Sequence, residues 1–201
     1  MWKSPVESWL IDPQAPPDSL EAKQPFIDNG LDVFNPGRYY DAEVMQREWE
    51  RLWTCSWLIA GVETDIPEPG DYSVFRVRRE SIVIVRQPDG GVKALYNVCP
   101  HRGNQIVQND RGSATQFTCA FHSWQYGLDG VCTRITDEET FNPALLKDRP
   151  RMGELRCETR AGLVFINMDD NAAPLDERLG LPDGYLEAYE LDKMHCVRHV
   201  V

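Results

Sequence analysis

The sequence contains little positive charge for its size. Its 201 residues include 21 Lys and Arg against 32 Asp and Glu, which gives a formal net charge of -11 at pH 7. The cations form no Lys/Arg-rich run and no basic stripe of the kind that marks a phosphate-binding face. We therefore expect no nucleic-acid partner.

Long hydrophobic runs are also missing. Apolar stretches such as Leu163–Ile166 are far shorter than the roughly 20 residues that a bilayer-spanning helix needs. The start of the chain lacks the charged segment followed by an apolar segment that marks a signal peptide. We therefore expect a cytoplasmic protein without a membrane partner.

The cysteines do not form the pattern of a disulfide framework. There are six at uneven spacing in an acidic chain, which favours metal ligation plus bystander thiols. Cys55, Cys132, Cys157 and Cys196 have no partner at metal-binding spacing. We interpret these four as small, buried or half-buried side chains without chemistry.

The chain divides into three segments by pattern. Prolines among mostly polar neighbours predict a surface arm over residues 1–37. Residues 38–190 predict one domain, because a hydrophobic content of 42% can fill one core. Residues 191–201 end in Val-Arg-His-Val-Val with no turn or polar tail after it. We interpret them as the first strand of a further, catalytic domain.

Most of the central segment has the pattern of short strands. From Asp41 to Trp53 apolar residues recur every three or four positions, which predicts an amphipathic helix. Pro88–Gly91 predicts the turn of a hairpin. We expect a mostly β fold, a small antiparallel barrel or sandwich plus an N-terminal helix. Strands are predicted at 57–60, 72–78, 82–86, 92–98, 116–119 and 163–168.

Two short motifs each combine a thiol with an imidazole. Cys99 and His101 enclose one residue, Cys119 and His122 enclose two, and residues 102–118 separate the motifs. A structural zinc site of the finger type normally pairs Cys with Cys and His with His in separate segments. A 2Fe-2S cluster with two Cys on one iron and two His on the other needs both loops to reach both irons. The mixed motifs therefore predict such a cluster on these four residues.

Residues beside the motifs could adjust such a cluster. Replacing two thiolates by neutral imidazoles removes negative charge and raises the reduction potential. Gly103 and Gly127 would let backbone N–H groups approach the sulfurs, whereas Gly130 is interpreted as a turn glycine. Trp124 and Tyr126 either pack under the cluster or tune it through their polar groups.

The ligand segments resemble those of a known family. Cys-Pro-His-Arg-Gly at 99–103 and Phe-His-Ser-Trp-Gln-Tyr-Gly-Leu-Asp-Gly at 121–130 are similar to the Rieske segment of the large (alpha) subunits of aromatic-ring-hydroxylating oxygenases. The similarity covers residues 38–200 and includes Gly-Leu-Val-Phe-Ile-Asn at 162–167. Ser123 departs from it, because the family more often has Gly after the second His.

The resemblance implies a Rieske-type antiparallel β domain with cluster-binding loops. It also implies an oxidoreductase, a mono- or dioxygenase. The complete subunit would take electrons from a reductase or ferredoxin and pass them through the Rieske 2Fe-2S cluster to a mononuclear non-heme iron that activates O2. A homo-oligomer, by resemblance a trimer, is implied as well.

The mononuclear iron needs two His and one carboxylate, and nothing in this sequence supplies that set. His195 and His199 lie four apart in a strand-like segment, about 13 Å along a strand and too wide for one metal. We therefore expect this iron outside the chain, in a C-terminal domain. The chain itself would transfer electrons and hold no catalytic residue.

Other classes of protein would use similar ligands. A free-standing Rieske ferredoxin would need the same four residues, but it is much shorter than this chain. A respiratory-type Rieske protein would carry an extra Cys in each loop and a membrane anchor. Here Arg102 and Gly103 follow one His, and Ser123 and Trp124 follow the other. A zinc-binding interaction module would be colourless and contain no sulfide.

Overall fold

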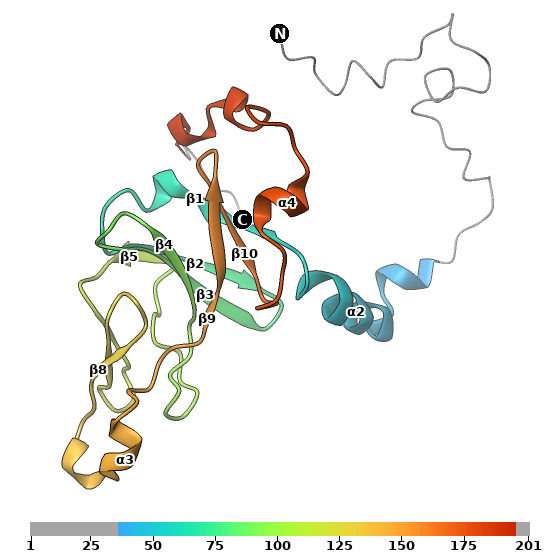
Figure 1. Ribbon diagram of the computed structural model, residues 1–201. Helices are drawn as coiled ribbons and strands as arrows, with labels where there is room; N and C mark the ends of the chain where they lie inside the picture. Colours follow the sequence, from blue (N-terminus) through green and yellow to red (C-terminus); the bar gives the residue numbers. More distant parts are fainter. Residues whose placement is uncertain (1–35, 196–201) are drawn as a thin grey trace, which may run out of the picture. The chain divides into compact units, whose positions relative to one another are not determined.

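A computed structural model describes residues 36–195 (Figure 1). The chain divides into two units between Ala42 and Glu43, and the second unit contains all the described strands. Almost all of the predicted arm at 1–37 lies outside the described residues, and so do Cys196 and His199.

The helix predicted from Asp41 to Trp53 is present. Helix α2 (Ala42–Glu48) continues directly into a π-helical turn, η3 (Trp49–Trp53). The hydroxyl of Thr54 closes its end by donating to the carbonyl of Trp49 at 3.0 Å. Neither α2 nor η3 contains a buried residue, so the apolar stripe that predicted the helix is not buried in this structure.

The larger sheet is antiparallel throughout, as predicted. Its seven strands follow the order β1-β10-β9-β4-β3-β2-β5. The predicted hairpin is confirmed, because β3 and β4 pair in antiparallel register from Ile82↔Tyr96 to Arg86↔Val92. The strands are β1 (Leu58–Val62), β2 (Asp71–Val77), β3 (Glu80–Arg86), β4 (Val92–Tyr96), β5 (Arg111–Ser113), β9 (Glu154–Arg160) and β10 (Leu163–Asn167).

Strand β3 lies between two hydrophobic clusters. Successive side chains of a strand point to opposite faces, so Ile82 and Ile84 join one cluster and Val83 and Val85 join the other. All four are fully buried. The cluster that contains Val83 and Val85 also contains Cys99 and the other residues that pack beneath the candidate ligands.

A second, three-stranded sheet has the order β6-β7-β8 and carries part of the candidate site. Its strands are short: β6 (Phe117–Thr118), β7 (Gln125–Tyr126) and β8 (Cys132–Arg134). The segment after β8 contains η5 (Glu138–Thr140) and α3 (Pro143–Leu146). Figure 1 shows β8 and α3 at the opposite end of the second unit from α4.

The remaining helices are short. A strand was expected from residue 191, but residues 191–193 form a 3-10 helix and residues 196–201 lie outside the described part of the chain. No helix in residues 36–195 is both long and apolar enough to cross a membrane. The remaining short helices are η2 (Pro36–Tyr39), η4 (Glu63–Asp65), α4 (Leu175–Leu179), η6 (Glu187–Tyr189) and η7 (Leu191–Lys193).

Candidate metal centre

The first ligand loop, residues 99–104, lies between β4 and β5. Two backbone hydrogen bonds close it. The N–H of Cys99 donates to the carbonyl of Asn104, and the N–H of Gly103 donates to the carbonyl of Cys99, both at 2.8 Å. Gly103 has φ +72°, a left-handed conformation that glycine adopts without steric cost.

The second ligand loop, residues 119–124, connects β6 to β7 and repeats this pattern. The N–H of Cys119 donates to the carbonyl of Trp124, and the N–H of Ser123 donates back to the carbonyl of Cys119, both at 2.9 Å. Ser123 has φ +59°, so it occupies the position of Gly103 in both hydrogen bonding and conformation. The departure of Ser123 from the family pattern thus falls at a position that favours glycine.

The structure brings the two predicted cysteine ligands together. Cys99 and Cys119 are each 2% exposed and belong to one core cluster, and the side chain of Cys99 helps to lower the pKa of the Cys119 thiol. A side-chain donor faces each sulfur. The hydroxyl of Tyr126 lies 3.0 Å from Cys99 Sγ, and Nδ2 of Asn104 lies 3.7 Å from Cys119 Sγ. Tyr126 is fully buried. It packs under the site and its hydroxyl also contacts a sulfur.

The surroundings of Cys119 favour its thiolate. Burial alone would raise the pKa of the thiol. Hydrogen bonds from the backbone N–H groups of Phe121 and His122, and from the side chains of Cys99 and Asn104, outweigh it and lower the pKa. The thiolate is the form that binds metals.

Gly103 and Gly127 were expected to let backbone N–H groups approach the sulfurs, and their own N–H groups donate to carbonyl oxygens. The N–H of Gly103 donates to the carbonyl of Cys99 at 2.8 Å, and that of Gly127 donates to the carbonyl of Val131 at 2.9 Å. Gly130, interpreted as a turn glycine, closes the turn by donating to the carbonyl of Gly127 at 3.0 Å. The backbone N–H groups that act on the Cys119 thiol are those of Phe121 and His122, and sequence reasoning missed the side chain of Asn104.

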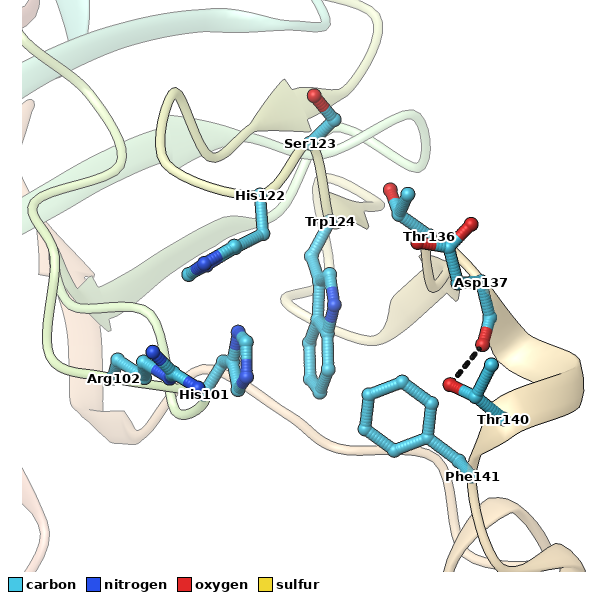
Figure 2. Close-up of a pocket in the computed structure, with 9 residues that line it drawn as sticks. All are labelled: His101, Arg102, His122, Ser123, Trp124, Thr136, Asp137, Thr140 and Phe141. Atoms are coloured by element: carbon cyan, nitrogen blue, oxygen red, sulfur yellow. Dashed lines mark hydrogen bonds between the residues drawn. The ribbon is translucent and has the colours of Figure 1, made fainter.

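The two predicted histidine ligands also lie side by side. Their ring centroids are 4.7 Å apart, and His101 stacks on Trp124 with a centroid distance of 4.5 Å and an interplanar angle of 2° (Figure 2). The ring of Phe141 packs edge-on against the Trp124 indole, with a centroid distance of 5.7 Å. Burial, followed by the charges of His122 and Arg102, lowers the pKa of His101, which favours the neutral ring that binds metal.

The imidazoles open onto a pocket of about 380 Å³, whereas the sulfurs are buried. Val98 and Phe121, which flank the ligands in sequence, are 40% and 57% exposed. The imidazole side of the site therefore faces the surface. The pocket is lined by His101, Arg102, His122, Ser123, Trp124, Thr136, Asp137, Thr140 and Phe141 (Figure 2).

The other described cysteines belong neither to the pair of cysteine ligands nor to the pair of histidine ligands. Cys132 is buried in the core beneath the site, where its thiol donates to the carbonyl of Arg134 at 3.4 Å. Cys157 on β9 is half-buried, and burial raises the pKa of its thiol to about 12. Cys55 is exposed. In residues 36–195 no three His, Cys, Asp or Glu side chains gather as ligands of a single metal ion.

Comparisons with known proteins point to one family. Residues 56–149 match the family described as the Rieske [2Fe-2S] domain. The chain is 36% identical over 167 residues to the benzene 1,2-dioxygenase alpha subunit of Pseudomonas putida, covering 83% of this chain and 37% of that protein. It is 35% identical over 144 residues to the carnitine monooxygenase oxygenase subunit of Acinetobacter pittii, covering 70% and 38%.

Solved structures give the same result. A naphthalene 1,2-dioxygenase with indole bound in its active site has a TM-score of 0.66 and 30% identity, over 70% of this chain and 32% of that one. An apo quaternary ammonium Rieske monooxygenase has a TM-score of 0.67 and 32% identity, over 78% and 44%. The chain thus spans less than half the length of each of these relatives.

Proposed function

Residues 56–149 match the Rieske [2Fe-2S] domain, and on that premise we propose that Cys99, His101, Cys119 and His122 hold a 2Fe-2S cluster. The cluster would be the electron-transfer centre of a ring-hydroxylating oxygenase alpha subunit. The observation that carries this proposal is the pairing of the side chains. The two cysteine side chains are buried in one core cluster, and the two imidazoles lie side by side nearer the surface.

This donor set fits the cluster. A Rieske cluster takes two Cys on one iron and two His on the other, so each iron needs only two protein donors. The two closed loops supply one sulfur pair and one imidazole pair. When bound, the cluster supplies a reversible one-electron step. The protein keeps the sulfurs away from water, since Cys99 and Cys119 are each 2% exposed.

The role within a larger enzyme rests on the relatives. They are named as alpha or oxygenase subunits of dioxygenases and monooxygenases, and the chain spans less than half of their length. Electrons would arrive from a reductase or ferredoxin, and a mononuclear iron in the remaining part of such a subunit would activate O2. Residues 38–190 would be the Rieske domain of a cytoplasmic homo-oligomer, a trimer by resemblance.

The test is metal analysis followed by turnover. We expect two irons and two sulfides per chain and a red-brown oxidised protein. Reduced with NADH and a flavin reductase, the chain should reoxidise in air without hydroxylating aromatic or amine substrates. Stoichiometric zinc without sulfide would refute the cluster assignment. Substrate-dependent hydroxylation by this chain alone would refute the proposed division of labour.

A further inference from the structure

Asn104 contacts both cysteine positions of the site. Its backbone carbonyl accepts from the N–H of Cys99 at 2.8 Å within the first ligand loop. Its side-chain Nδ2 reaches across to the second ligand loop and lies 3.7 Å from Cys119 Sγ. One residue therefore links the two loops, and it does so at the buried sulfur side of the site.

The orientation of the Asn104 amide is fixed by a second contact. Nδ2 also lies 2.8 Å from the carbonyl oxygen of Gln105, and an oxygen acceptor must face the NH2 group rather than Oδ1. With one hydrogen of that group on Gln105, the other is available for the sulfur of Cys119. The side chain is thus positioned as a donor to sulfur.

We propose that Asn104 raises the reduction potential of the cluster by donating a hydrogen bond to the Cys119 sulfur. This inference rests on the proposed function. Reduction adds negative charge to the cluster, so a donor on a ligand sulfur stabilises the reduced form more than the oxidised form. The effect is larger here than in water because Cys119 is buried, where electrostatic interactions are less screened. Asn104 is a positioning residue in this scheme, since it acts through Cys119.

Two substitutions at this position separate the loss of the hydrogen-bond donor from the addition of a negative charge. Asn104→Leu removes the donor while keeping a similar volume, so that water does not simply replace it. Asn104→Asp keeps the shape and adds a negative charge. Gln108→Leu is the matched control, because Gln108 is an exposed amide on the same segment and its side chain donates to the carbonyl of Gln105 at 3.0 Å, away from the sulfurs.

The midpoint potential of the full chain with its cluster is the deciding measurement. A lost hydrogen bond changes the reduction equilibrium constant by roughly fivefold, which converts to about 40 mV because tenfold is about 59 mV for one electron. We expect Asn104→Leu to lower the potential by this amount, Asn104→Asp to lower it further, and Gln108→Leu to leave it unchanged. A purely structural role for Asn104 would change stability or cluster content but not the potential.

The proposal would be overturned if Asn104→Leu holds an intact cluster whose reduction equilibrium constant is within twofold of that of the unchanged protein. If both Asn104 variants fail to assemble a cluster, the unchanged protein still decides the matter. Pulsed EPR of its reduced form, with 15N in the asparagine side chains, should show a weak nitrogen coupling, and the lack of one would also overturn it. Absence of iron and sulfide from the unchanged protein would instead refute the proposed function.

Discussion

Ser123 holds a conformation that costs a non-glycine residue free energy. Its φ of +59° matches the +72° of Gly103, and the two residues make equivalent hydrogen bonds in the two ligand loops. An L-residue pays about 1–2 kcal/mol in the left-handed region. Glycine avoids this cost but loses roughly 0.5–1 kcal/mol through its greater freedom in the unfolded chain. We therefore expect Ser123→Gly to stabilise the protein by about 0.5–1 kcal/mol.

Thermal unfolding of the unchanged protein and of Ser123→Gly under identical conditions measures this gain in stability. For a chain of this size, 1 kcal/mol shifts the midpoint by about 2–4 °C, so the Gly variant should melt about 1–4 °C higher. Ser123→Ala is the control, because it removes the hydroxyl but keeps the Cβ that causes the strain. Its midpoint should be nearly unchanged.

The reciprocal substitution tests the same reasoning from the other loop. A Cβ at Gly103 would meet no atom within 4 Å, so Gly103→Ser reports backbone strain without a steric clash. It should lower the midpoint by an amount comparable to the gain from Ser123→Gly. A Gly variant at position 123 that melts below the unchanged protein would refute the strain argument.

Two further substitutions test the site, and one labelling experiment tests a cysteine outside it. Tyr126→Phe removes the hydroxyl 3.0 Å from Cys99 Sγ and should lower the midpoint potential; an unchanged potential would mean that Tyr126 only packs there. His122→Cys should lose the cluster or lower its potential, since a charged thiolate replaces a neutral imidazole, and a raised potential would contradict the charge argument. Burial, and then nearby glutamates, raise the pKa of Cys157 to about 12. Its thiol therefore stays protonated below that pH, and alkylation at pH 8 followed by mass spectrometry should modify Cys55 but not Cys157.

The sequence was informative where a single segment determines the structure. The helix from Asp41 and the β3–β4 hairpin were predicted because their periodicity and turn residues are local. The strands β5, β7 and β8 were missed because they are two or three residues long, too short to show alternation. They exist through backbone pairing with neighbouring strands, which is not visible in their own side chains.

Strand β9 was missed for a different reason. Its alternate positions include Leu155 and Cys157, but charged residues occupy the positions between them, and the run looks polar. Partners elsewhere accommodate this charge. Arg160 pairs with Asp176 at 2.7 Å and with Glu187 at 3.3 Å, both on later helices. Sequence alone does not reveal such distant partners, so the alternation was obscured.

A buried residue outside the ligand motif ties the segment before the first ligand loop to the segment after it. Asn97 is 3% exposed, and its Nδ2 donates to Val107 O at 2.8 Å and to Ser81 Oγ at 3.2 Å. Its Oδ1 accepts from the N–H groups of Ile106 and Val107 at 3.2 and 2.8 Å. A side-chain amide has two donor hydrogens and two acceptor lone pairs, so these four hydrogen bonds occupy all of them. In the sequence Asn97 falls within the strand predicted at 92–98, where nothing marks it as a residue that holds a loop. Recognising the four ligands from their motif therefore does not establish what holds them in place.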